Sequence, residues 1–377
     1  MKRILTKVIM AFTGCMLMVL GSVSLASAVS FNVTQITTNS SDDSAVQISK
    51  NGDMVWVGPG LNGFTDIYVS DGVTRVIKTL TNGVSVNKSP QINDKGDIVW
   101  RTFNSAESDW NIMLYTKATN LIKRISLAKD PLYEHFDNDP QINNLGQVVY
   151  SSQDGGTDVE IMFYDGTSVS RVTNNTNVDD ESPGLNDSGD IVWMAASTTI
   201  GSPYDIYLRD GVSKAIIQIT TSAVNEGKAR INSAGDIVWP AWDGANYQLK
   251  YYKRSTQATT TITTGAYDNV DVKINANGYV AWGQQSTNDQ EIYLRNGLTG
   301  TNKNISNNSA KDDGSPVIND NGWVAWNQDQ GTTGTNDQIF VYDGLTTTRF
   351  ITNAYDHEIP AINSTVSITS RTKDGVV

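Results

Sequence analysis

One eleven-residue pattern returns along the chain at near-regular intervals, and it constrains the fold more than any other feature. It reads PQINDKGDIVW at residues 90–100. Six further copies share its apolar start, its turn residues with a glycine and its β-branched end with an aromatic, and they begin at residues 46, 140, 183, 229, 272 and 316. The shared glycines are 43 to 50 residues apart, and a shortened eighth copy begins at Pro360. A repeat of this length predicts a ring or array of similar units.

Each repeat contains the signals of four short antiparallel strands. In residues 183–220, an apolar segment, turn residues at 186–189 and the run at 191–193 predict a first hairpin. The alternating sequence of 205–220, with a turn at Asp210-Gly211, predicts a second one. No helical periodicity interrupts these strands. Four-stranded sheets that recur about every 45 residues predict an all-β fold, a single β-propeller of four-stranded antiparallel blades.

The two ends of the chain decide the expected number of blades. Residues 33–37 predict an extra fourth strand, whereas residues 359–363 predict an extra first strand, with a second at 366–370. Pairing these segments would close the last blade with both termini and would cover two open sheet edges. Eight blades are therefore the favoured count, and seven blades with two spare tails are the alternative.

The repeat resembles the WD-like propeller repeats of TolB and its relatives. The family's unit stands here as DESP at 180–183, GDIVW at 189–193, DIY at 205–207 and IT at 219–220. This resemblance implies a TolB-like propeller without the α/β domain that precedes the propeller in TolB. Asparagine, as in Asn186, replaces the Ser-Pro of the family's turn. The resemblance implies no particular function, because such repeats occur both in scaffolds and in peptidase propellers.

The start of the chain has the three parts of a secretory signal. A basic front is followed by an apolar run at 8–20 and by small residues at 26–28. We therefore expect a signal peptide at 1–28 and a propeller domain at 29–377, exported to the periplasm or the cell exterior.

Composition limits the partners and the chemistry. The only cysteine, Cys15, lies within the predicted signal, so we expect neither disulfides nor thiol chemistry in the exported protein. The net charge of −12 argues against nucleic acid as a partner. No later stretch approaches the roughly 18 consecutive apolar residues that a membrane span needs, so membrane insertion is not expected. We expect a monomer.

The aromatic residue that ends each copy is predicted to pack between neighbouring blades, because its place in the repeat does not change. These residues are Trp56, Trp100, Tyr150, Trp193, Trp239, Trp282 and Trp326.

Binding is expected on one face of the propeller. The turns inside the two hairpins of each blade are short and alike, and they share one face, which we call the hairpin face. The loops between second and third strands and the blade-to-blade connections lie on the opposite face, which we call the connection face. These segments are long and differ between repeats, and variable loops on a rigid scaffold usually carry binding.

Acidic residues gather in the blade-to-blade connections. They either cap their own turns or form a ring that attracts a basic partner or calcium. No D-x-D-x-D-G spacing supports a calcium loop, so calcium stays an open alternative and no other cofactor is expected. The candidate binding residues are Asp137, Asp139, Asp179, Asp180, Asp268, Asp312, Asp313 and Asp356, with Trp110 and Trp242 near the variable loops.

The leading hypothesis is a non-catalytic scaffold that binds a protein or a polysaccharide, with a preference for a basic partner, through the connection face. The competing hypothesis is a carbohydrate-active or other hydrolytic propeller that uses loop carboxylates as acid and base. No G-x-S-x-G nucleophile motif supports a peptidase. The only histidines, His135 and His357, lie in different connections and are not expected to share a metal.

Overall fold

The structure is a computed structural model. It describes residues 34–37, 43–126, 137–153, 158–197, 199, 201–287, 289–308, 311–330, 337–350, 357–372 and 375–376. The predicted signal at 1–28, His135 and Asp356 lie outside the described residues.

Seven sheets are four-stranded antiparallel blades, and in each of them the strands follow one another in chain order. Blades 1 to 4 consist of β1 (Ser44–Ile48), β2 (Met54–Pro59), β3 (Thr65–Ser70), β4 (Ile77–Thr79), β5 (Asn87–Ile92), β6 (Ile98–Asn104), β7 (Asp109–Thr116), β8 (Leu121–Arg124), β9 (Asp137–Ile142), β10 (Val148–Ser152), β11 (Glu160–Tyr164), β12 (Val169–Arg171), β13 (Val178–Leu185), β14 (Ile191–Ser197), β15 (Asp205–Arg209) and β16 (Ile216–Gln218). Blades 5 to 7 consist of β17 (Arg230–Ile231), β18 (Ile237–Trp242), β19 (Tyr247–Lys253), β20 (Ala258–Thr261), β21 (Asn269–Ile274), β22 (Val280–Gln285), β23 (Gln290–Arg295), β24 (Asn302–Asn304), β25 (Asp313–Ile318), β26 (Val324–Asp329), β27 (Asp337–Tyr342) and β28 (Thr347–Arg349).

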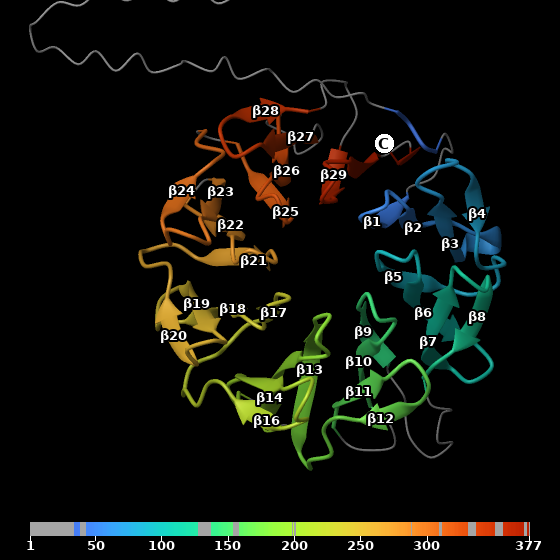
Figure 1. The fold of residues 1–377 in the computed structure, drawn as a ribbon, viewed down its shortest axis with the longest axis horizontal. Coiled ribbons are helices and arrows are strands. Elements are labelled where there is room, and N and C mark those ends of the chain that lie inside the picture. The colour runs from blue at the N-terminus through green and yellow to red at the C-terminus, as the bar shows by residue number, and fades with distance from the viewer. Residues whose placement is uncertain are drawn as a thin grey trace, which may run out of the picture. The chain divides into compact units, whose positions relative to one another are not determined.

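The first strand of each blade, which we call the inner strand, faces a central channel (Figure 1). A short 3-10 helix, η1 (Leu61–Gly63), joins β2 to β3. No helix among the described residues is long and apolar enough to cross a membrane. The predicted all-β propeller of four-stranded blades is thus confirmed.

The blade count corrects the favoured prediction. Seven blades are four-stranded, as in the alternative, and the eighth sheet has only three strands: β29 (His357–Ile362), β30 (Ile368–Thr372) and β31 (Gly375–Val376). It lies between blade 7 and blade 1. Residues 34–37, the described part of the segment expected to complete it, form no strand. They are held by blade 1 instead: Thr37 Oγ1 donates to Asp43 Oδ2 at 2.7 Å, and Ile36 packs beside Trp56.

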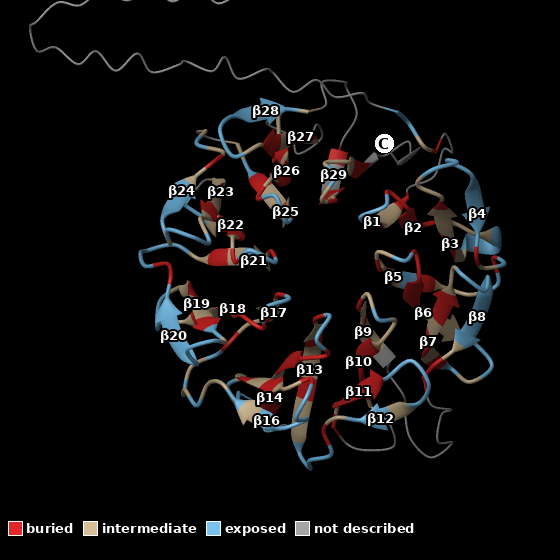
Figure 2. Cartoon of the chain, in the orientation of Figure 1, coloured by how far each residue is buried: buried red, intermediate tan, exposed pale blue. Residues whose placement is uncertain are grey.

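The core lies between neighbouring blades. Trp100 of blade 2 packs with Val55 and Ile67 of blade 1, and Trp193 of blade 4 packs with Val149 and Ile161 of blade 3. Outer strands such as β4, β20 and β28 are exposed (Figure 2). All seven repeat aromatics are at most 1% exposed. Six of them pack with the preceding blade, as predicted, whereas Trp56 packs with residues of blade 1 and with Ile36.

A ring of asparagine side chains joins the hairpin ends of the inner strands. Each asparagine, 4–5% exposed, donates from Nδ2 to the backbone oxygen of the equivalent residue in the next sheet, at 2.8–3.1 Å. Ser49 takes the position in blade 1, and its oxygen accepts the last bond, from Asn363 of the three-stranded sheet. The ring therefore closes non-covalently between the last sheet and the first. Its asparagines are Asn93, Asn143, Asn186, Asn232, Asn275, Asn319 and Asn363.

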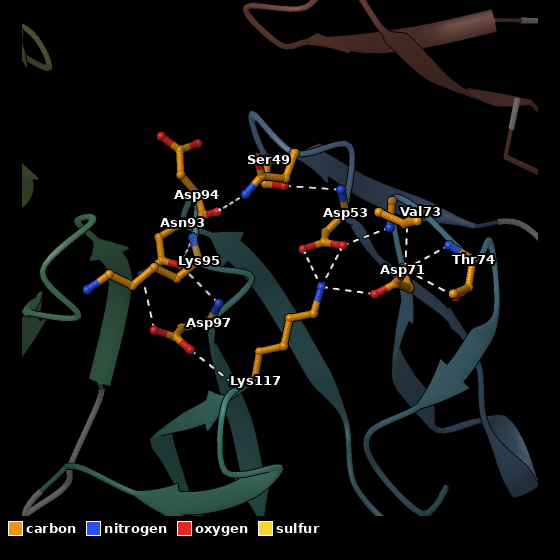
Figure 3. A network of polar contacts seen from close by, with 12 residues as sticks. Ser49, Asp53, Asp71, Val73, Thr74, Asn93, Asp94, Lys95, Asp97 and Lys117 are labelled. Carbon is orange, nitrogen blue, oxygen red and sulfur yellow. Dashed lines mark hydrogen bonds and ion pairs between the residues drawn. The ribbon is translucent and has the colours of Figure 1, made fainter.

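The aspartate after the repeat glycine ties the two hairpins of its blade together. Its side chain accepts a backbone N–H from the outer turn at 2.7–3.0 Å: Asp53 from Gly72, Asp97 from Lys117, Asp190 from Gly211 and Asp236 from Arg254. Between blades 1 and 2, the ammonium of Lys117 also reaches Asp53 at 2.7 Å and Asp71 at 3.0 Å (Figure 3). The hairpin face is thus occupied by contacts that hold the frame together.

Candidate functional site

The residue thirteen positions before a repeat tryptophan accepts a hydrogen bond from its indole. The pairs are Asn87 with Trp100 (3.1 Å), Asp180 with Trp193 (2.6 Å), Glu226 with Trp239, Asn269 with Trp282 (2.9 Å) and Asp313 with Trp326 (2.8 Å). Every acceptor is buried. Amides and carboxyl groups are therefore interchangeable at this position, which makes it part of the frame.

Burial sets the protonation of two of these carboxyl groups. Asp180 and Asp313 are each 1% exposed, and removal from water raises the pKa of each to about 6. Side-chain amides satisfy their remaining oxygens: Asn175 donates to Asp180 at 2.7 Å, and Asn308 donates to Asp313 at 2.7 Å.

The residue one position earlier fastens the preceding blade. Its side-chain oxygen accepts the backbone N–H at the start of that blade's third strand: Asp179 from Val159 (2.9 Å), Asn225 from Tyr204 (3.2 Å), Asp268 from Tyr247 (2.6 Å) and Asp312 from Gln290 (3.1 Å). In the pairs Asp179-Asp180 and Asp312-Asp313, the first carboxylate therefore holds the preceding blade, and the second holds the indole of its own blade. Their predicted role in binding stays a prediction.

The other predicted site residues are scattered. Asp137 starts β9, and its side chain is outside the described set. Trp110 lies under two cations, with the guanidinium carbon of Arg101 4.5 Å and Lys88 Nζ 5.5 Å from the ring centroid. Trp242 meets Tyr247 edge to face at 5.3 Å. The binding roles of both tryptophans stay predictions.

His135 lies outside the described residues, and His357 belongs to no metal-binding group among them. His357 is fully buried, and its Nδ1 lies 3.2 Å from Ser370 Oγ. No group of three or more His, Cys, Asp or Glu among the described residues could hold a metal ion.

A groove of about 510 Å³ between blades 6 and 7 gathers acid on the connection face. None of its described lining residues is basic. Asp289 Oδ1 and Asn327 Oδ1, both in this lining, are buried without a hydrogen-bond partner among the described residues. We call this site the acidic groove, and its aspartates are Asp289, Asp312, Asp313, Asp329 and Asp337.

The central channel contains a second cavity, of about 550 Å³. The residue two positions before each ring asparagine, or before Ser49, forms a belt around it, which we call the channel belt. The belt reads Gln47, Gln91, Gln141, Gly184, Arg230, Lys273, Val317 and Ala361, and all but Gly184 line the cavity.

Backbone bulges present a second layer of side chains toward the connection face. Six inner strands place a non-glycine residue at φ between 48° and 53°, two positions before the belt. This left-handed conformation is costly for such residues and is typical of functional sites. The six are Ala45, Ser89, Asp139, Ser182, Asp271 and Ser315.

The charges of the channel lie on one side. Lys228 forms an ion pair with Asp139 at 3.3 Å, whereas neither Arg230 nor Lys273 forms an ion pair or a side-chain hydrogen bond with a described residue. Burial lowers the pKa of Arg230. Burial, and then the positive charge of Arg230, lower the pKa of Lys273 to about 8.

The sequence prediction of the site missed Arg230, Lys273 and the belt glutamines. Their signal was present in the repeat itself: where other copies read P-Q-I-N or P-V-I-N, the fifth reads A-R-I-N and the sixth V-K-I-N. Among the predicted site residues that the structure describes, only Asp139 lines the channel cavity.

No family model matches the chain. No curated protein is significantly similar to it in sequence. Solved structures show the fold. The propeller domain of the Trilobed protease from Pyrococcus furiosus is 14% identical with a TM-score of 0.57, and the match covers 83% of this chain and 98% of that one.

Longer proteins also match. Dipeptidyl peptidase 4 from Porphyromonas gingivalis is 9% identical with a TM-score of 0.62, and this chain covers 58% of its length with 89% of its own. TolB from Acinetobacter baumannii is 14% identical with a TM-score of 0.44, covering 81% and 80% of the two chains. The matches with TM-scores above 0.5 show a β-propeller fold, which this chain shares with peptidase propellers.

Proposed function

We propose that this chain is an exported, non-catalytic propeller that binds a basic segment of a protein or polymer in the acidic groove of its connection face. One observation carries the proposal. Five aspartates line the groove, two buried acceptor atoms there have no donor among the described residues, and no described lining residue supplies a positive charge. Lysine or arginine side chains would supply both the donors and the charge.

The remaining connection-face carboxylates support a scaffold rather than an enzyme. Asp179, Asp180 and Asp268 use their oxygens to hold indole or backbone N–H groups of the frame. A catalytic carboxylate must instead be able to reach a substrate proton or carbon atom. Export follows from the signal expected at 1–28 and can be checked by cell fractionation.

A charge-matched comparison tests the groove. The probe is fluorescein-labelled hexalysine, and its affinity is measured by fluorescence anisotropy at low and at physiological ionic strength. In the variant Asp289→Asn with Asp329→Asn, we expect roughly tenfold weaker binding, because two of the five groove charges are removed. Wild-type binding should also weaken as salt screens the groove.

The control variant is Asp187→Asn with Asp320→Asn, which removes the same charge from two exposed residues of the hairpin face. It should bind hexalysine as the wild type does. Equal affinity for the groove variant and the wild type would exclude the groove as the binding site.

The alternative is a hydrolytic propeller, and one observation favours it enough to merit an assay. Asp313, whose pKa is raised to about 6, lines the same groove as a second carboxyl group, that of Asp312, and paired carboxyl groups with different environments are typical of acid–base catalysis. Turnover of a chromogenic glycoside or peptide substrate by the wild type, and its loss in Asp313→Asn, would replace the scaffold proposal.

A further inference from the structure

The channel belt has two polar parts, one of glutamines and one of cations, and each comes from consecutive blades. Gln47, Gln91 and Gln141 come from three consecutive blades, and Arg230 and Lys273 come from two others. Val317 and Ala361 complete the lining with small apolar groups. The same strands carry near-identical asparagines two residues later, so the frame does not require this difference between blades.

Neither belt cation forms an ion pair with a described residue. Asp271 attracts both of them electrostatically, but it is exposed and forms no ion pair with either. Asp139 also attracts Arg230 electrostatically, but its carboxylate forms its ion pair with Lys228. Two partly desolvated like charges side by side are unfavourable, and an anion between them would relieve the repulsion. The net charge of the chain is −12, so this patch runs against the overall composition.

The lining also limits what kind of anion fits. Arginine binds a carboxylate through two parallel hydrogen bonds, and lysine adds a point charge. Glutamine offers both a donor and an acceptor, which suits hydroxyl groups. Neither Gln47 nor Gln91 forms a side-chain hydrogen bond with a described residue. The volume of about 550 Å³ lies in the range of small-molecule sites, about 300–1,000 Å³.

We propose that the central channel is a binding site for a sugar acid, with the carboxylate held by Arg230 and Lys273 and the hydroxyl groups held by Gln47, Gln91 and Gln141. This site shares no lining residue with the acidic groove, and it requires a ligand of opposite charge. The protein would thus recognise an acidic carbohydrate at its axis independently of the basic partner proposed for the groove.

The first test compares two sugars that differ in charge. Binding of glucuronate and of glucose to the purified protein is measured by calorimetry and by ligand-observed NMR. We expect glucuronate to bind and glucose to bind at least tenfold more weakly. In Arg230→Gln with Lys273→Gln, glucuronate affinity should fall at least tenfold, because both carboxylate partners are lost. Arg75→Gln with Lys95→Gln, which changes two exposed cations, should leave the affinity unchanged.

The second test needs no charge-deleting variant for its main result. Arg230 and Lys228 from the fifth blade, Asp271 from the strand of Lys273 and Asp139 from the third blade are the charged groups that face Lys273 in the cavity. Because the pKa of Lys273 is about 8, glucuronate affinity should weaken up to about tenfold from pH 7 to pH 9. Lys273→Gln should remove most of this dependence.

Three results would overturn the proposal. One is equal binding of glucose and glucuronate, and another is glucuronate binding that survives the Arg230 and Lys273 double substitution in a folded protein. The third is capture of a peptide through its free carboxyl group without any binding of glucuronate. Hexalysine binding does not depend on these cations, so failure here is distinguishable from failure of the groove proposal.

Discussion

The inner strands carry two belts of side chains, two residues apart. One belt is nearly uniform in sequence, and the other varies from blade to blade. The asparagine ring repeats one side chain in seven sheets and joins each sheet to the next. The channel belt carries glutamine, glycine, arginine, lysine, valine and alanine. Both belts lie on the same inner strands, but the ring asparagines are buried between the sheets, whereas all belt residues but Gly184 line the cavity. This difference separates the positions that build the propeller from those that remain free for a ligand.

The largest expected effect concerns the ring. In Asn232→Ala, the backbone oxygen of Asn275 loses its donor, and the N–H groups of Ala234 and Asp236 lose their acceptor. Because Asn232, Asp236 and Asn275 are buried, we expect a loss of about 3 kcal/mol in the free energy of unfolding. Urea denaturation measures it. The belt substitution Gln91→Ala should change this free energy by less than about 0.5 kcal/mol, and equal losses in the two variants would erase the distinction between the belts.

A smaller effect sharpens the frame side of the comparison. The folded-state pKa of Asp180 and of Asp313 is about 6, above the ordinary 3.8, so the folded state binds these protons more tightly than the unfolded state. Their contribution to stability is complete below about pH 4 and is lost as the pH rises through 6, by on the order of 2 kcal/mol per group.

Blades 2 and 6 supply the matched substitution, because Asn87 and Asn269 already bind the indole there. Asp180→Asn with Asp313→Asn should therefore remain folded at pH 7 and should lose the fall in unfolding free energy between pH 4 and 6. A fall identical to that of the wild type would show that other groups cause it.

The smallest expected effect has the opposite sign. Lys273→Gln removes a partly desolvated charge beside Arg230, so we expect it to raise the free energy of unfolding at pH 7 by about 1 kcal/mol. Thermal unfolding at pH 7 and pH 10 measures it, and the gain should shrink at pH 10, where the wild-type lysine is neutral in the folded state. A destabilised Lys273→Gln protein would place this residue with the frame.

The blades could be predicted because each strand and turn has a local signature. Hairpins such as the one ending at Trp193 combine turn residues with β-branched runs, and these signals act within ten or so residues. The closure of the ring depends on contacts between chain ends. Residues 34–37 looked like a strand by composition, but the bond from Thr37 to Asp43 and the packing of Ile36 keep them with blade 1.

The sites were less accessible to prediction. The acidic connections stood out by composition, yet composition does not tell a latch such as Asp179 from a groove residue such as Asp289, because the hydrogen-bond donors come from another blade. Arg230 and Lys273 are 43 residues apart in the sequence, and only the ring geometry brings them to one wall. A position-by-position alignment of the repeats would have exposed them, since the other copies have an uncharged residue at this position.

The asparagine ring also makes the belt positions of the different blades structurally equivalent. Each of the eight belt positions holds one side chain on a nearly identical backbone. The side chains at these positions can therefore vary independently around the channel axis. Exchanging Arg230 and Lys273 with Gln47 and Gln91 would move the two positive charges to another pair of blades. The amino-acid composition of the cavity lining would stay the same. A propeller of this kind can acquire a new ligand specificity through substitutions at belt positions, while its fold stays the same.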